Sequence, residues 1–289
     1  MPPNGALLKP FLVPRTVGSD SHQNIQDFVR QHFQALGWHF ETDRFQRDTV
    51  IGKKVFTNLI ATANPFAKQR IILCAHYDSK IDFMDGSQKV TNFVGATDSA
   101  WPCALLLELA ASLPRGSDDL TIQMVFFDGE ESFLDWSRSD SLYGANHLAH
   151  VWSGSAQSHQ RLDKIKYMML LDLLGAPSPK FYSFFQDTAP VFQKLALAES
   201  DARRKGLLRT PRRLFITEQS IMGRQHGHYY VEDDHVPFSM RNVPIVHIIP
   251  TPFPSVWHKK HDDVTALDPD TCHDLALIIH TVIHRELAA

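Results

Sequence analysis

An apolar stretch that ends in adjacent glutamates constrains this chain more than any other feature. Leu120–Phe127 is apolar except for Thr121 and Gln123 and is long enough for a buried strand, and it is followed by Asp128, Gly129, Glu130 and Glu131. In an α/β sheet, ligands bind in the crevice beyond the carboxyl ends of the strands. Adjacent glutamates are most often part of a solvated turn, so a functional role for this pair depends on other polar groups reaching the same edge.

Length and composition are those of an ordinary soluble globular protein. With 289 residues, 43% of them hydrophobic and 21% charged, the chain can bury a sizeable core as one large domain or two small ones. The formal net charge of −3 gives no reason to expect nucleic acid as a partner. No stretch is long enough to predict a transmembrane segment.

Helical and extended patterns alternate along the chain. Apolar residues at helical spacing predict helices over residues 21–37, 102–113, 139–151, 188–208 and 269–287. Apolar runs predict strands over residues 38–49, 54–63, 70–76, 120–127, 166–174 and 244–250. Residues 209–230 lack a clear period and are expected to form a surface excursion. The exposed face of the helix before them is expected to carry Glu199, Asp201, Arg203 and Arg204.

This order of elements predicts an α/β fold with a mostly parallel central sheet flanked by helices. No internal repeat, low-complexity tract or linker divides the chain. We therefore expect a single globular domain over residues 20–289. It is preceded by a proline-rich, irregular N-terminal arm over residues 1–19, which we expect to lie on the surface.

Imidazole and carboxylate groups are delivered to one edge of this predicted sheet. Each of them lies at a strand end or in the loop that follows, and they are His76, Asp98, Glu130, Glu131, Asp172 and His258. A mixture of nitrogen and oxygen ligands without thiolates suits a catalytic zinc ion. Taken singly, each has an ordinary structural explanation, such as a helix N-cap for Asp98. Their convergence on one crevice favours a functional site.

Several motifs resemble those of a known family. They are HYDSK at 76–80, FVGATDSA at 93–100, FDGEE at 127–131, DSLYG at 140–144, LDLLGAP at 171–177 and FPSVWH at 253–258. In order and spacing they are similar to those of the glutaminyl-peptide cyclotransferases, the glutaminyl cyclases of animals. That family is structurally akin to the zinc aminopeptidases, so the resemblance implies a zinc aminopeptidase-like fold and makes residues 20–289 the catalytic domain.

The resemblance implies a metal site and its ligands. Asp98, Glu131 and His258 match the residues that hold one zinc ion in the family, and a fourth position stays open. His76 and Asp172 match residues that help to hold a second ion in the aminopeptidases. We expect one zinc ion per chain, although the identity of the ligands alone does not count the metals.

The resemblance also implies an acyltransferase reaction and its catalytic residues. A glutaminyl cyclase converts the N-terminal glutamine of a peptide, and more slowly glutamate, to pyroglutamate, and ammonia leaves from glutamine. Glu130 matches the general acid and base, and Asp172 and Asp233 match carboxylates that hydrogen-bond to it and to the substrate amine. The walls of the glutamine pocket match Trp136, Phe253 and Trp257. Without the resemblance, a position in the core would be the commoner one for these aromatic residues.

Two alternative functions remain open at this point. One is a two-zinc aminopeptidase that hydrolyses N-terminal residues on the same scaffold. The other is a non-catalytic binding relative, which the retention of Glu130 and the metal ligands disfavours. The resemblance further implies peptide or protein substrates with N-terminal glutamine, a monomer, and the secretory pathway, as a secreted or Golgi enzyme. We expect a form that lacks its targeting segment.

The cysteines allow more than one arrangement. Cys74, Cys103 and Cys272 are compatible with one bridge and one free thiol or with three free thiols. Family members often carry a cysteine directly before His76, where this chain has Ala75. Because successive strand residues face opposite sides, a family-type bridge between Cys74 and Cys103 is doubtful.

Overall fold

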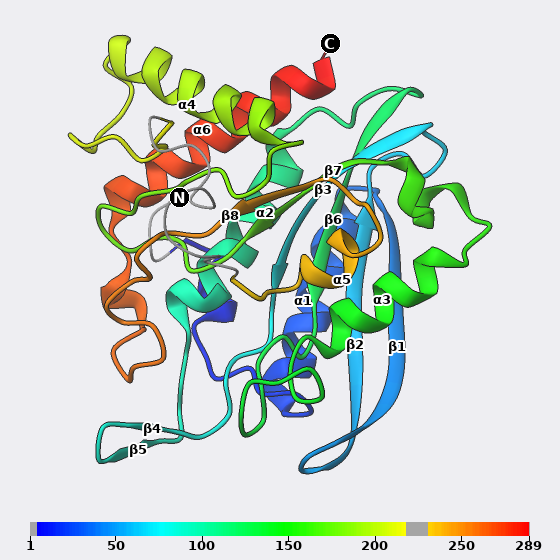
Figure 1. Cartoon of the computed structure of the whole chain (residues 1–289), viewed down its shortest axis with the longest axis vertical. Coiled ribbons are helices and arrows are strands. Elements are labelled where there is room, and N and C mark those ends of the chain that lie inside the picture. The colour runs from blue at the N-terminus through cyan, green and yellow to red at the C-terminus, as the bar shows by residue number, and fades with distance from the viewer. Residues whose placement is uncertain (1–4, 218–230, 289) are drawn as a thin grey trace.

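The computed structural model describes residues 5–217 and 231–288 and has a six-stranded central sheet (Figure 1). The strands lie in the order β1 (His39–Thr49), β2 (Gly52–Thr62), β6 (Leu120–Phe127), β3 (Gln69–His76), β7 (Ile165–Leu171) and β8 (Ile245–Ile248). Neighbours from β6 to β8 are parallel, whereas β1 pairs with β2 and β2 with β6 in antiparallel fashion. The predicted α/β fold is confirmed, with a mixed sheet in which three of the five strand pairings are parallel.

Helices cover both faces of the sheet (Figure 1). The larger hydrophobic core joins one face to residues of α1 (Asp20–Ala35), α2 (Trp101–Ser112), α4 (Ala189–Arg204) and α6 (Pro269–Ala288). The smaller core joins the other face to residues of α3 (Tyr143–Ser153) and α5 (Val236–Ser239). The central strands between these layers are therefore buried on both sides, which explains why their sequences are mainly apolar.

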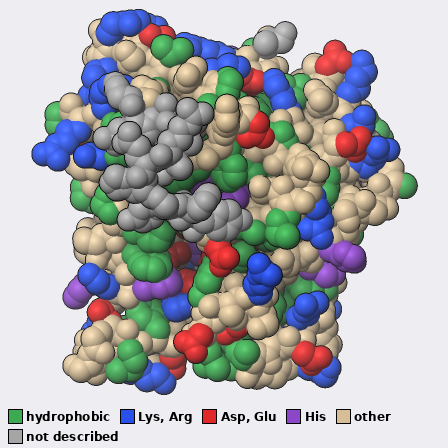
Figure 2. Space-filling model, in the orientation of Figure 1, with side chains coloured by type: hydrophobic (Ala, Val, Ile, Leu, Met, Phe, Trp, Pro, Cys, Tyr) green, Lys and Arg blue, Asp and Glu red, His purple; other side chains and the backbone are tan. Residues whose placement is uncertain are grey.

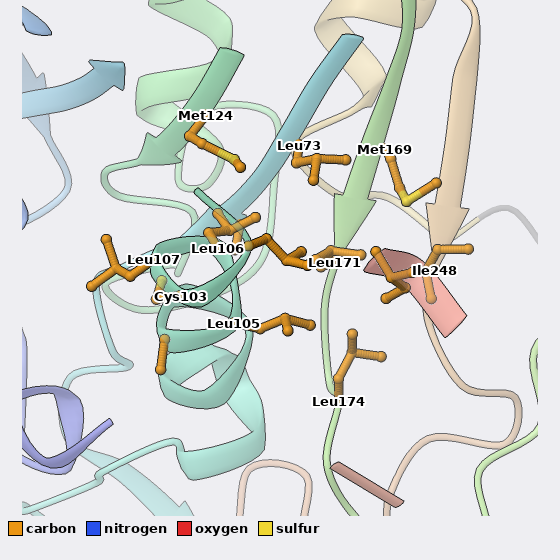
Figure 3. Close-up of a cluster of buried hydrophobic side chains, with 14 of the residues drawn as sticks. Leu73, Cys103, Leu105, Leu106, Leu107, Met124, Met169, Leu171, Leu174 and Ile248 are labelled. Carbon is orange, nitrogen blue, oxygen red and sulfur yellow. The ribbon is translucent and has the colours of Figure 1, made fainter. Parts of the chain in front are cut away.

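Strand β6 shows how alternation divides such a run. Ile122, Met124 and Phe126 belong to the larger core, and Val125 and Phe127 to the smaller one. Figure 3 shows the larger core, in which leucines of α2 lie among side chains of the central strands and of the loop after β7. Burial on both faces anchors the end of β6, and the glutamates that follow it are held in a fixed place.

The cysteines obey the same alternation. Cys74 lies in the smaller core and Cys103 in the larger one, on opposite faces of the sheet. All three cysteines are buried and free. The doubt about a family-type bridge is thus supported by the fold.

The surface location expected for residues 1–19 is wrong for several residues of the described part of this segment. A short 3-10 helix, Lys9–Phe11, brings Leu8 and Phe11 into the larger core, where both are fully buried. Arg15 is also fully buried, and its guanidinium donates to backbone carbonyl oxygens, among them that of Tyr77 at 2.8 Å. The segment is irregular in backbone but packed, because apolar and hydrogen-bonding groups between the prolines find partners in the core.

The helix α4 and the chain after it differ from the prediction in another respect. Glu199, expected on the exposed face, is buried and accepts from the backbone N of Leu214 at 2.8 Å and of Phe215 at 3.0 Å. Leu214 and Phe215 are buried too, so the expected surface excursion is wrong for them. The rest of the predicted excursion, over residues 218–230, lies outside the described residues. Basic side chains gather near α4 on the face shown in Figure 2.

Other differences are smaller. The predicted helix over residues 139–151 begins later, at Tyr143, and α1 begins at Asp20 with Ser19 as its N-cap. Besides α5 and the turn Lys9–Phe11, short elements that the sequence did not predict are β4 (Phe83–Asp85), β5 (Gln88–Val90) and the single turns Ala96–Ala100, Ser158–Gln160, Leu162–Lys164 and Val264–Ala266. Among the described residues, no helix has the length and apolar character needed to cross a membrane.

Candidate active site

A cavity of about 660 Å³ opens at the carboxyl ends of the central strands. Strand β6 leads into Glu130 and Glu131, and β7 leads into Asp172. All but one of the residues that the sequence assigned to the site line this cavity: Asp98, Glu130, Glu131, Trp136, Asp172, Asp233, Phe253, Trp257 and His258. The exception is His76, which lies behind the lining and contacts Asp98 at 2.9 Å. The structure therefore brings the predicted site together, and the individual roles of its residues stay predictions.

The predicted metal ligands form one cluster. The Nε2 atom of His258 lies 3.2 Å from Oε1 of Glu131 and 3.4 Å from Oδ2 of Asp98. Buried Oδ2 of Asp98 accepts no hydrogen bond from the described residues. The nitrogen and oxygen atoms converge within 4.8 Å of one another. An unpartnered buried carboxylate oxygen beside an imidazole and a second carboxylate fits a zinc ion with a position open to the cavity.

A second cluster shares Asp98. The Nε2 atom of His76 lies 2.9 Å from Oδ1 of Asp98 and 3.4 Å from Oδ1 of Asp172. The imidazoles of His76 and His258 together outweigh the effect of burial and hold the pKa of Asp98 well below its usual range. Asp98 thus lies between two groups of ligands, as a carboxylate that bridges two metal ions would.

The turn after β6 is held by a residue that the sequence analysis did not select. Asp78 accepts from the backbone N of Glu130 at 3.1 Å and of Glu131 at 3.2 Å. Gly129 has a φ of 66°, and a Cβ there would lie 2.4 Å from the ring of Phe56. Only glycine fits this bend. The signal for Asp78 was its place in the HYDSK motif, at the end of the neighbouring strand β3.

The carboxylates of the cavity differ in their affinity for protons. Burial raises the pKa of Glu130 well above its usual value, and the negative charges of Glu131, Asp233 and Asp234 act in the same direction. Burial and the charge of Asp233 raise the pKa of Asp172 to about 6. A site whose carboxyl groups differ in this way in their affinity for protons is suited to proton transfer.

The pKa of Asp233 is shifted in the opposite direction, downward, by a partner that the sequence did not reveal. Its Oδ2 lies 2.7 Å from Nε2 of His247, and both side chains are buried. This imidazole outweighs burial and lowers the pKa of Asp233. His247 lies in the middle of β8, where a single histidine within an apolar run gave no signal.

The aromatic side chains form the mouth of the cavity. Trp136 and Trp257 remain 40% and 41% exposed, so the alternative that they are core residues is wrong. The ring centroids of Phe253 and Trp257 are 5.0 Å apart, and Trp257 stacks on the ring of His258 at 4.5 Å. Trp136 donates from Nε1 to Glu232 at 3.0 Å. These contacts fix the rings beside the cluster of predicted metal ligands.

Comparison with known proteins agrees with this geometry. The model of peptidase family M28 matches residues 58–283. A glutaminyl-peptide cyclotransferase of Drosophila melanogaster is 43% identical over 285 residues, which cover 93% of this chain and 76% of that protein. This chain belongs to the glutaminyl-peptide cyclotransferases. A glutaminyl-peptide cyclotransferase-like protein of Bos taurus is 42% identical over 283 residues, covering 94% of this chain and 72% of that protein.

Solved structures of other proteins have the same fold as this chain. The crystal structure of Macrostomum lignano glutaminyl cyclase superposes with a TM-score of 0.86 at 37% identity and covers 97% of this chain and 88% of that chain. A Zn-dependent exopeptidase of Parabacteroides distasonis, at 23% identity, has a TM-score of 0.78 and covers 96% of this chain and 95% of that chain, which shows the shared fold. The family resemblance and the prediction of an enzyme are confirmed.

Proposed function

We propose that this glutaminyl cyclase converts the N-terminal glutamine of peptides and proteins to pyroglutamate with the help of one zinc ion, and that it acts on N-terminal glutamate more slowly. The observation that carries the proposal is the position of Glu130. It lies beside the cluster of Asp98, Glu131 and His258, in a cavity with an aromatic mouth. A proton carrier, metal ligands and a pocket for a small side chain are then in one place.

Asp98, Glu131 and His258 would hold the zinc ion. When bound there, zinc supplies Lewis-acid chemistry at the γ-carbonyl oxygen of glutamine and stabilises the charge that develops on it. The carboxylates balance the charge of the ion. Trp257, stacked on His258, and Trp136 enclose the substrate side chain, so that its amide stays close to the α-amine of the same residue. This proximity supplies part of the rate enhancement.

The bond changes are internal to the substrate. The α-amine nitrogen attacks the γ-carbonyl carbon, the new C–N bond closes a five-membered lactam, and the old C–N bond breaks to release ammonia. Glu130 takes the proton from the attacking amine and gives it to the departing nitrogen, so no proton is gained or lost overall. Asp172 and Asp233 hydrogen-bond to the amine and to Glu130, which orients both.

A mass measurement tests the proposed reaction. A peptide that begins with glutamine is incubated with the zinc-loaded enzyme, and the product is expected to be lighter by one ammonia, with its remaining sequence intact. Glutamate at the same position is expected to lose water more slowly. Loss of a whole residue from the peptide would contradict the proposal.

The competing function is a two-zinc aminopeptidase, which the cluster of His76, Asp98 and Asp172 makes possible. Such an enzyme needs a water molecule at the metal pair and releases free amino acids from many peptides. The same incubation with a peptide that begins with leucine separates the functions, since the aminopeptidase releases leucine and the cyclase leaves that peptide unchanged.

We further propose that the enzyme is a monomer and works in the secretory pathway, where peptides with free N-terminal glutamine pass. The division into a segment over residues 1–19 and a catalytic domain over residues 20–289 belongs to this proposal. Sedimentation of the purified protein tests its state of association.

A further inference from the structure

A further cluster of histidine and glutamate side chains, distinct from the two clusters that share Asp98, lies outside the cavity. Oε2 of Glu41 is 2.9 Å from Nε2 of His159 and 3.3 Å from Nε2 of His39. The rings of His39 and His159 are 5.3 Å apart between centroids, at an angle of 78°. One ligand atom of each residue lies within 4.8 Å of the others. None of the three residues lines the active-site cavity.

The fold brings these residues together from distant parts of the chain. His39 and Glu41 lie two residues apart on the edge strand β1, so they point to the same face. His159 comes from the single turn Ser158–Gln160, in the connection between α3 and β7. The cluster therefore joins the edge of the sheet to the connection that packs beside it.

The facing atoms are not used in hydrogen bonds. Among the described residues, Oε2 of Glu41 and Nε2 of His159 are buried atoms that have no hydrogen-bond partner, although they are only 2.9 Å apart. Ligand atoms that lie this close together and make no hydrogen bond to each other are suited to a cation.

Surrounding contacts hold two of the ligands in place. The other oxygen of Glu41, Oε1, accepts from Nε2 of Gln160 at 3.1 Å, and Gln160 in turn accepts from Oγ of Ser155 at 2.8 Å. The backbone oxygen of His159 accepts at 3.1 Å from Nε2 of Gln123, which is fully buried in β6. Partners of this kind orient metal ligands and increase their affinity.

We propose that His39, Glu41 and His159 bind a second divalent transition-metal ion, with zinc as the cation of choice. Two imidazoles and one carboxylate are a zinc-binding set, and hard cations such as calcium would prefer oxygen ligands alone. His39 is exposed, which leaves an approach for the ion and for a water ligand. The bound ion links β1 to the connection between α3 and β7 through its ligands. It stabilises the fold and takes no part in turnover.

Zinc content tests the proposal. Wild type, Glu41→Gln and His159→Asn are freed of metal, equilibrated with buffered free zinc, and assayed for zinc per chain. The matched control is His150→Asn, an exposed histidine on α3 that belongs to no cluster of metal ligands among the described residues. Each cluster variant is expected to bind one zinc ion fewer than wild type, and the control the same number. Equal zinc in wild type and in both cluster variants would overturn the proposal.

Two further readouts separate this site from the active site. Turnover with saturating active-site zinc is expected to be unchanged in the cluster variants, whereas Glu131→Gln loses turnover. In the Glu131→Gln background, zinc at 100 times its Kd is expected to raise Tm by about 5 °C, and His159→Asn is expected to abolish this rise. A Tm rise that persists in the double variant would place the ion elsewhere and would also overturn the proposal.

Discussion

The carboxylate of Asp78 supports the backbone of Glu130 from the neighbouring strand end, with 3.1 Å between Oδ1 and the amide nitrogen. The other oxygen of Asp78 accepts from the next amide, that of Glu131, at 3.2 Å. One buried side chain thus fixes the backbone of the proposed proton carrier and of a proposed metal ligand. Their relative position depends on a residue that need not touch the substrate.

Asp78→Asn tests this dependence. Asparagine keeps the size of the side chain but replaces one acceptor oxygen by an NH2 group, which faces an amide donor and repels it. We expect zinc affinity and kcat to fall together by about 10- to 100-fold, the range seen when partners of metal ligands are removed. Zinc titration and turnover at saturating zinc measure the two effects. A variant with wild-type values for both would show that the turn holds its shape without Asp78.

The pH dependence of turnover follows from the nucleophile. Only the neutral α-amine can attack, and free α-amines have a pKa of about 8. The rate at low substrate concentration is therefore expected to rise between pH 6 and about pH 8. A series of substrates whose amine pKa differs should shift the rise accordingly. A rate that is flat over this range would contradict attack by the amine.

Asp274 makes a pH-dependent contribution to the free energy of unfolding. This buried carboxylate accepts from the backbone N of Arg209 at 2.9 Å and of Thr210 at 2.8 Å, which ties α6 to the segment after α4. The adjacent His273 and these donors outweigh burial and lower the pKa of Asp274. Because the folded pKa lies below the unfolded value of about 3.9, the contribution is complete above that value and is lost as the pH falls through the folded pKa.

Asp274→Asn is accordingly expected to lower the free energy of unfolding at pH 7 by about 1 to 3 kcal/mol, the cost of leaving buried donors poorly paired. Urea denaturation at several pH values measures it. The difference between wild type and variant should stay constant from pH 7 to about pH 5 and shrink below about pH 4. A difference that grows toward acid pH would mean that the pKa of Asp274 is raised in the folded state.

The sequence was sufficient to predict the centre of this fold. Strand β6 has the predicted bounds, Leu120–Phe127, because a mainly apolar run between polar segments is a local signal. The site residues could be found because parallel strands deliver their carboxyl ends to one edge, so that residues distant in sequence, such as Asp98 and His258, share one cavity. The motif resemblance then supplied their expected roles.

The failures of prediction concern contacts that no local pattern encodes. Glu199 has the spacing of an exposed helical residue, yet it is buried because the backbone amides of Leu214 and Phe215 need an acceptor. Leu8 and Phe11 lie among prolines, which predict irregular backbone but carry no information about burial. His247, on the buried strand β8, acquires its role from Asp233 on another segment. Such pairings are properties of the tertiary structure.

We propose that Glu130 transfers protons and that the adjacent Glu131 binds zinc. A comparison of Glu130→Gln with Glu131→Gln tests these two roles most directly. Both substitutions keep the size of the side chain and remove its charge. Zinc content and cyclisation of a glutamine-initiated peptide are determined for each purified variant. We expect Glu130→Gln to retain zinc and lose at least about 100-fold in turnover, and Glu131→Gln to lose the metal together with its activity. Equal zinc in the two variants, or full activity of the wild-type enzyme after exhaustive chelation, would contradict a zinc-dependent cyclase in which Glu130 moves the proton.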